Sequence, residues 1–167
     1  MSRSLQIRAL HRFGLFALAF GLVIGAASPL ALAAGSRPFK GRVAATWDNI
    51  FNGLSPTGAT FQGGGPVTHM GNTTQKGTLF LQPTIAPLVF RGSGTVTITA
   101  ANGDELILKY EGLLFAATGE GRGTFTLSGG TGRFANATGQ GTFSALIDTS
   151  LPVNQPMTVE LNGRITY

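Results

Sequence analysis

The chain has 167 residues, of which twelve are Lys or Arg and seven are Asp or Glu, so its formal net charge is +5. It has no cysteine, which excludes disulfide bonds, a thiolate nucleophile and attachment to a lipid through a cysteine. Three of the basic residues lie in an N-terminal segment that we predict to be removed. The remaining nine basic residues face seven acidic ones, so the mature chain is only slightly positive and no partner nucleic acid is indicated.

Residues 1–33 have the pattern of a secretory signal peptide. Arg3, Arg8 and Arg12 precede an apolar stretch at 15–32, and Ala31-Leu32-Ala33 supplies the small residues that a signal peptidase requires. A membrane anchor is the alternative, but Gly, Ser and Pro interrupt the stretch and no basic flank follows it. We therefore predict cleavage before Ala34. Export without disulfides indicates a periplasmic or secreted bacterial protein.

The mature part, residues 34–167, suits one domain with one core. Short runs of alternating apolar and polar residues are separated by Gly, Asn and Pro, which is typical of an antiparallel all-β fold. In the first run Phe39, Val43, Ala45 and Trp47 share one face. The segment 52–66 that follows is rich in Gly and Pro, and we expect a long loop there.

Further strands are expected along the rest of the chain. Alternating runs lie at 78–81, 95–100, 105–111, 123–127, 142–147 and 157–167. Asn102-Gly103 offers a hairpin turn between the second and third of these runs. Together with the first run, this spacing indicates about eight strands, which form either a sandwich or a closed barrel.

The glycine-rich stretch SGGTGRFANATGQG at 128–141 matches a dinucleotide-binding pattern, G-x-G-x-x-A, at 130–135. That pattern binds a nucleotide only where a strand precedes it, a long helix follows it and an acidic residue lies about 20 positions further on. Here Gly139 and Gly141 would end a helix within two turns, and alternation resumes at Thr142. No nucleotide site is predicted.

The same stretch carries a family resemblance. VTHMGN at 67–72, AANGDEL at 100–106 and SGGTGRFANATG at 128–139, in this order, resemble the bacterial branch of the allene oxide cyclase barrel-like family. Plant dirigent proteins have a similar GGTG-x-F segment. The resemblance extends from the first strand to about Ile147. It implies a single eight-stranded antiparallel β-barrel over residues 34–167, with an interior that can hold an apolar molecule.

The resemblance assigns no catalytic residue. Plant cyclases place an acidic residue and an asparagine in motifs around their first strands, and segment 42–52 does not reproduce them. Asp48 and Asn49 lie nearby, but alternation places Asp48 on the face opposite Trp47. The family includes exported proteins of unknown role, cyclases and dirigent proteins, so the activity stays open.

Other catalytic or metal-binding patterns are missing from the sequence. His69 is the single histidine after residue 33, whereas a zinc site needs three or four ligands, so we expect His69 to bond a backbone group or to line a cavity. No two carboxylates are placed to face each other as in a glycosidase, and no G-x-S-x-G elbow occurs. We predict neither a metal nor a cofactor.

We interpret the glycine-rich stretch as a structural motif. Glycines with positive φ would allow one turn of helix that lays Phe134 across the end of the barrel, while Arg133 bonds free carbonyl groups. The alternative is that Arg133 holds an acidic ligand. The residues of this motif are Gly130, Gly132, Arg133, Phe134 and Gly139.

The size of the inward side chains decides whether such a barrel has room for a ligand, because eight strands enclose little more space than their own side chains fill. The candidate lining residues are the large inward side chains and the histidine: Val43, Trp47, His69, Tyr110, Phe125 and Phe143. We predict a non-enzymatic exported barrel that binds a small apolar ligand near Trp47.

Two alternatives stay open. A cyclase, isomerase or dirigent-like protein could shape an apolar substrate, because a chiral cavity can direct a spontaneous ring closure without acid–base chemistry. A small outer-membrane barrel is the other, since the final strand, with Val159, Leu161 and Ile165 on one face and a terminal Tyr167, resembles a closing strand of that class. We expect no stable membrane insertion, because Trp47 and Tyr110 fall within the apolar faces and do not form girdles.

Overall fold

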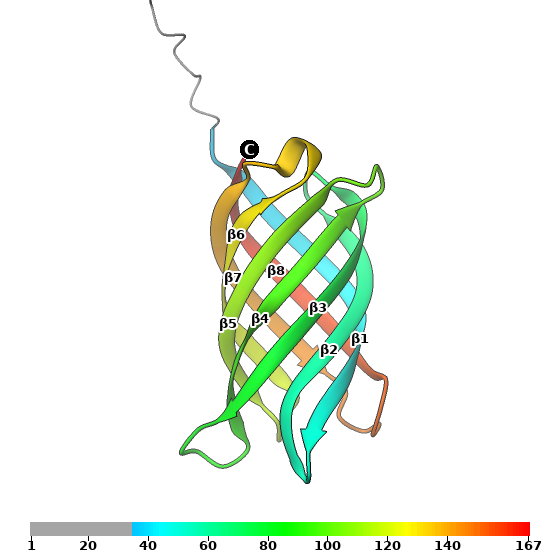
Figure 1. Cartoon of the computed structure of the whole chain (residues 1–167), viewed down its shortest axis with the longest axis vertical. Coiled ribbons are helices and arrows are strands. Elements are labelled where there is room, and N and C mark those ends of the chain that lie inside the picture. The colour runs from blue at the N-terminus through cyan, green and yellow to red at the C-terminus, as the bar shows by residue number, and fades with distance from the viewer. Residues whose placement is uncertain (1–34) are drawn as a thin grey trace, which may run out of the picture. The chain divides into compact units, whose positions relative to one another are not determined.

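The computed structural model describes residues 35–167, so the predicted signal peptide lies outside the described residues. Eight strands form one closed barrel (Figure 1). They are β1 (Arg37–Asn52), β2 (Ser55–Val67), β3 (Gly71–Pro83), β4 (Val89–Ala100), β5 (Glu105–Phe115), β6 (Glu120–Gly130), β7 (Thr138–Ile147) and β8 (Gln155–Thr166). A short 3₁₀ turn, η1 (Gly132–Phe134), lies between β6 and β7.

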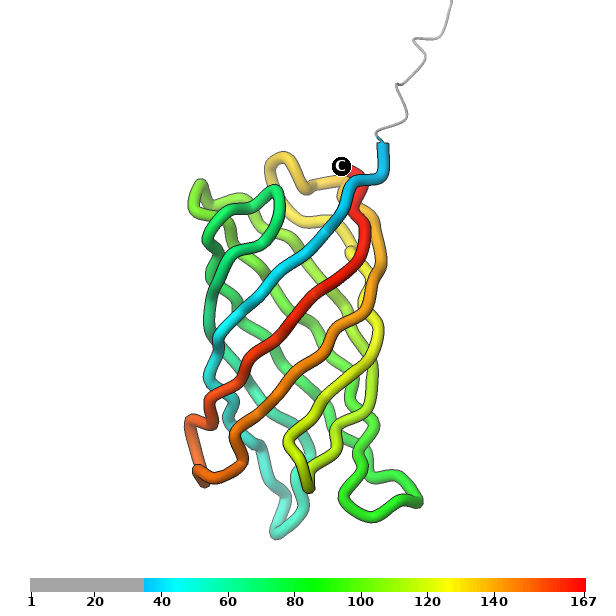
Figure 2. The backbone as a smooth tube through the Cα atoms, turned by 180° about the vertical axis from the view of Figure 1, so that it is seen from behind, coloured from blue at the N-terminus to red at the C-terminus, as the bar shows by residue number. Residues whose placement is uncertain are grey.

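Each strand pairs antiparallel with the next in the chain, and β8 returns to pair with β1. Figure 2 shows β1 and β8 side by side, where Gly41 faces Leu161 and Trp47 faces Gln155. The predicted single eight-stranded antiparallel barrel is therefore confirmed. Closure pairs every edge strand, so neither β1 nor β8 is left with a free edge.

The wall of the barrel is apolar inside and polar outside. On β1, Phe39, Val43 and Trp47 are buried, while Lys40 and Arg42 on the other face remain accessible. An outer-membrane barrel requires the reverse order, with the apolar face toward lipid, so the described wall does not fit that alternative. Among residues 35–167 no helix is long and apolar enough to cross a membrane.

The expected loop at 52–66 is wrong, because most of this segment is strand β2. It pairs with β1 on one side and with β3 on the other. Glycines here allow close approach of neighbouring strands: a Cβ atom at Gly63 or Gly65 would collide with the backbone of β1, and one at Gly64 with the backbone of β3. The glycines that suggested a loop are therefore needed by the sheet itself.

The two ends of the barrel differ. At the upper end in Figure 1, η1 covers the opening and both the start of β1 and the C-terminus lie nearby. Phe134 is fully buried there, with its ring centroid 5.1 Å from that of Tyr167. The lower end carries the four connections β1–β2, β3–β4, β5–β6 and β7–β8.

Candidate binding site inside the barrel

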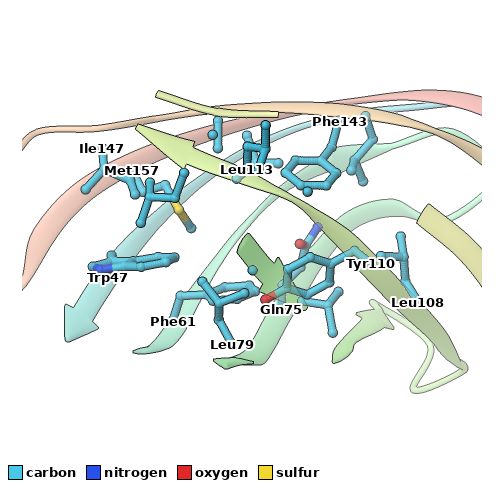
Figure 3. A pocket seen from close by; sticks show the side chains of 18 residues that line it. Trp47, Phe61, Gln75, Leu79, Leu108, Tyr110, Leu113, Phe143, Ile147 and Met157 are labelled. Carbon is cyan, nitrogen blue, oxygen red and sulfur yellow. The ribbon is translucent and has the colours of Figure 1, made fainter. Parts of the chain in front are cut away.

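The barrel encloses a cavity of about 80 Å³. Figure 3 shows the side chains around it, which come from all eight strands. Its larger lining residues are Trp47, Phe61, Gln75, Leu79, Val96, Leu108, Tyr110, Leu114, Phe143, Ile147, Met157 and Leu161. None of the described residues that line this cavity carries a formal charge. It is an apolar site with few polar atoms.

Small residues leave this space open. Gly92, Gly112, Gly121 and Ala145 line the cavity. Gly112 is also required by the packing of β5 on β6, because a Cβ atom there would collide with the backbone of Arg122. A Cβ atom added at Gly121 would meet its nearest neighbour, the Cβ of Ala145, at 3.4 Å, which is an ordinary contact. An extra methyl group therefore fits at Gly121. Strand pairing does not require a glycine at this position, so the space beside it is part of the cavity.

Four aromatic rings form a continuous series along the cavity. The rings of Trp47 and Phe61 are stacked, with centroids 6.3 Å apart and an interplanar angle of 7°. Phe61 then meets Tyr110 edge to face at 6.3 Å, and Tyr110 meets Phe143 edge to face at 5.7 Å. Such pairs stabilise one another by about 0.5–1.5 kcal/mol beyond their buried area, so this part of the wall is well ordered.

Trp47, together with Leu114 and Ile147, lies between the cavity and a second hollow of about 180 Å³, because these three residues line both of them. Asn49, Phe51 and Gln155 line the outer hollow, and these residues lie near the lower end of the barrel. The Trp47 indole N–H donates to Asn49 Oδ1 at 2.9 Å. Asn49 Nδ2 in turn donates to Gln155 Oε1 at 3.3 Å, so a short hydrogen-bonded series holds the indole across the opening.

Tyr110 is the one ionisable group that lines the cavity. Its hydroxyl donates to the carbonyl oxygen of Thr78 on β3 at 3.0 Å. Burial raises the pKa of Tyr110 above its ordinary value, because a phenolate would lose its hydration there. The hydroxyl is therefore neutral near pH 7, and its proton is already engaged.

Gln75 adds the other polar group. It points inward from β3, is 6% exposed and lines the cavity. Its Nε2 is the one buried side-chain nitrogen or oxygen without a hydrogen-bond partner among residues 35–167. An unpaired donor in a buried position is costly, so this nitrogen marks a place where a partner is expected.

The lower end of the barrel has an apolar rim. The large hydrophobic side chains that are exposed among the described residues all lie on its four connections or near the strand ends beside them. They are Ile50, Phe51, Leu54, Phe80, Ile85, Leu88, Leu113, Leu146, Leu151 and Val153. The tips at 49–57, 83–90, 116–119 and 149–157 contain no charged residue. The outer hollow thus lies at the apolar end of the molecule.

Three of the six predicted lining residues do line the cavity, namely Trp47, Tyr110 and Phe143. Val43 and Phe125 do not, because both are packed in the solid core of the upper half, where Phe125 meets Phe39 edge to face at 5.8 Å. Both side chains are buried in this core, with Val43 2% and Phe125 1% exposed.

Of the two roles expected for His69, the structure shows the backbone contact and not the lining of this cavity. His69 lies in the β2–β3 turn with a φ of 68°, at the end opposite the apolar rim. Its Nε2 lies 2.9 Å from the carbonyl oxygen of Pro38, which is the backbone contact expected of a structural histidine. Within residues 35–167, no three His, Asp or Glu side chains gather where they could bind a metal ion.

The glycine-rich motif closes the upper end. Gly130 ends β6, Gly139 lies in β7, and Gly132 has a φ of 53°. Phe134 is buried beneath the turn, as the sequence predicts. Arg133 differs from the prediction: its Nε lies 3.4 Å from Asp104 Oδ2, so it pairs with a carboxylate of the β4–β5 turn and does not bond free carbonyl groups.

Sequence reasoning missed Phe61, Gln75 and the inward glycines. Phe61 was hidden because its segment was expected to be a loop. Gln75 shares the inward face of β3 with Leu79 and Leu81. The alternation of inward and outward residues along this strand could therefore have indicated that Gln75 points inward. The glycines could not be found in this way, because their alignment depends on the register between strands.

No family model and no curated protein matches the chain. The fold is that of a closed β-barrel, and two solved structures of dirigent proteins are similar to it. The pterocarpan synthase dirigent protein GePTS1 is 12% identical, with 79% of this chain and 86% of that chain covered and a TM-score of 0.45. For the pterocarpan synthase dirigent protein PsPTS1 the identity is 12%, the coverage is 80% and 96%, and the TM-score is 0.46. At this identity the likeness concerns the fold alone, and membership of the allene oxide cyclase family stays a prediction.

Proposed function

We propose that the protein binds a small, uncharged, apolar molecule inside its barrel, and that the molecule enters past Trp47. The position of Trp47 carries this proposal, since it is the largest of the three side chains, with Leu114 and Ile147, that line both the inner cavity and the outer hollow. Protein interiors are normally close-packed. A cavity that persists beside Gly121, where an extra methyl group would fit, supports a binding site.

The lining determines the kind of ligand. A buried charge without a partner is very costly, and the cavity offers no counter-charge. Apolar surface removed from water stabilises a complex by about 25 cal/mol per Å², so hydrocarbon rings and chains suit these walls. The charge-free rim at the same end supports approach of apolar molecules from that side.

The size of the cavity requires Trp47 to move. Its 80 Å³ is smaller than the engineered cavity of about 150 Å³ that admits benzene. A swing of the indole would join the inner cavity to the outer hollow of about 180 Å³. A ring-sized ligand therefore binds in an open state that the Asn49 hydrogen bond opposes.

A second candidate function is the shaping of a reactive apolar substrate, as in the dirigent-like or cyclase alternative. The cavity is asymmetric in shape, because a series of aromatic rings forms one part of its wall and glycines form another. Tyr110 is neutral and its proton is engaged, so acid–base catalysis is not favoured. Such a cavity could still hold a molecule in one conformation while it closes a ring unaided.

Binding is tested by the fluorescence of Trp47, which is the single tryptophan of the chain. We expect methylenecyclohexane to change its emission saturably in the wild type. Ala145→Leu should abolish the change, because the added side chain fills the cavity that Ala145 lines. Ser144→Leu is the matched control, since residue 144 is exposed on the outer face of the same strand.

A linear response, or an equal response in the wild type and Ala145→Leu, would contradict binding in the cavity. Native mass spectrometry of protein purified from its own host addresses the second candidate. A bound molecule that the protein converts to one enantiomer of a cyclic product supports shaping, whereas a molecule recovered unchanged supports binding alone.

We further propose that the barrel acts outside the cytoplasm after removal of residues 1–33. The charge and hydropathy pattern of that segment supports this proposal. An intact mass that begins at Ala34 is expected for protein recovered from its host, and a mass that retains residues 1–33 would overturn it.

A further inference from the structure

The unpaired side-chain amide of Gln75 indicates a further property of the ligand, in addition to its apolar character. Gln75 is 6% exposed, yet its Nε2 has no hydrogen-bond partner. Thr73, two residues earlier on the same buried face of β3, is satisfied, since its hydroxyl donates to the carbonyl oxygen of Gly65 at 2.9 Å. A buried polar side chain on β3 can therefore find a hydrogen-bond partner within the protein. Gln75 Nε2, which lies where the cavity begins, has none.

The other side-chain donors of the cavity are already used. The Trp47 indole N–H donates to Asn49, and the Tyr110 hydroxyl donates to the Thr78 carbonyl. Among the described lining side chains this leaves Gln75 Nε2 as the free N–H donor. Gln75 Nε2 is thus the side-chain donor available for a hydrogen bond to a ligand.

We propose that the ligand carries a neutral hydrogen-bond-accepting oxygen, of the carbonyl or ether class, which accepts the N–H of Gln75 Nε2. This inference rests on the proposed function, since it concerns the same cavity. A carboxylate does not fit, because no cation lines the site to balance it. The ligand is therefore a ketone, aldehyde, ester or cyclic ether with an otherwise hydrocarbon body.

The positions of Trp47 and Gln75 on opposite sides of the cavity orient this ligand. In Figure 3, Trp47, Ile147 and Met157 lie together on one side, while Gln75 lies near Tyr110 and Leu108. The oxygen therefore points inward to Gln75, and the hydrocarbon part lies against the rings of Trp47 and Phe61. A molecule that enters past Trp47 leads with its polar end.

The test compares two probes of the same shape, cyclohexanone and methylenecyclohexane, which differ by C=O against C=CH₂. Binding is measured by Trp47 fluorescence. We expect the wild type to prefer the ketone by about threefold to tenfold after correction for the transfer of each probe from water, as one neutral hydrogen bond provides. Gln75→Leu should remove this preference, and Thr73→Val, which changes a buried polar residue outside the cavity lining, should retain it.

A second measurement does not depend on any variant. In ¹H–¹⁵N spectra of the wild type, cyclohexanone should shift the side-chain amide protons of Gln75, and methylenecyclohexane should not shift them downfield. Equal binding of both probes in the wild type and in Gln75→Leu would overturn the inference while leaving the apolar site intact. Binding of neither probe would overturn the proposed function as well.

Discussion

The side chains of Trp47 and Asn49, two residues apart on the inward face of β1, are joined by a 2.9 Å hydrogen bond from the indole N–H to Oδ1. This bond positions the largest side chain of the barrel between its inner cavity and its outer hollow. The closed state of the site therefore depends on a polar contact at the opening as well as on the stacking of Trp47 with Phe61.

We predict that Asn49→Ala opens the site. The variant loses the bonds to Trp47 and Gln155, so the free energy of unfolding should fall by about 1–3 kcal/mol. Association of methylenecyclohexane, followed by stopped-flow fluorescence, should become faster because the indole is released. Asn52→Ala, at an exposed position on the same strand, is the control. An unchanged association rate in Asn49→Ala would show that Trp47 does not control access.

Gly132 is predicted to be essential for the cap of the upper end. Its φ is 53°, and a Cβ atom there would collide with the carboxylate of Asp104. Gly132→Val should therefore lower the free energy of unfolding by about 1–3 kcal/mol or more, measured by chemical denaturation. Retention of wild-type stability would mean that the turn relaxes without cost.

Arg133→Ala should have a smaller effect than Gly132→Val. Its ion pair with Asp104 is partly exposed, with 45% of the Arg133 side chain and 20% of the Asp104 side chain accessible, and such pairs are worth about 0–1 kcal/mol. Affinity for methylenecyclohexane should stay unchanged, because the cap lies away from the cavity lining. Loss of binding without loss of stability would identify Arg133 as part of a binding site.

Alkaline pH should destabilise the protein through Tyr110. Its pKa is raised by burial, so the folded state keeps the proton where the unfolded chain, with a pKa of about 10, releases it. The stabilisation is therefore complete below about pH 10 and is lost as pH rises toward the folded pKa. In Tyr110→Phe the loss of stability above pH 10 should be smaller, as measured by urea unfolding at several pH values. Identical alkaline profiles would contradict the burial of this hydroxyl.

The apolar rim is predicted to contribute little to folding. Leu54 is 100% exposed and Ile85 is also fully accessible, so Leu54→Ser with Ile85→Ser should change the free energy of unfolding by no more than about 0.5 kcal/mol. Binding of an apolar dye to the folded protein should fall. A large loss of stability would instead mean that these side chains are covered in solution.

Much of the fold could be predicted from the sequence. The hairpin formed by β4 and β5 follows from the alternation on both sides of Asn102-Gly103. Within its connection, residues 101–104, Gly103 has a φ of 87°. Strand β2 could not be predicted, because Gly63, Gly64 and Gly65 read as a loop when the neighbouring strands are unknown.

The cavity was predictable only in part. Alternation places Trp47, Tyr110 and Phe143 inside, but the solid core around Val43 and the hollow beside Gly121 follow from which residues share a level of the barrel. That depends on the register between strands, including strands distant in sequence such as β1 and β8, where Ala45 lies opposite Met157. No local pattern contains this information.

The most direct test of the central claim is a crystal structure under xenon pressure, because xenon binds in apolar cavities. We expect a xenon atom inside the barrel of the wild type, between Trp47, Leu79 and Phe143, and none there in Ala145→Leu. Xenon bound only at the outer surface, or an interior collapsed to close packing in the wild type, would contradict a binding site behind Trp47.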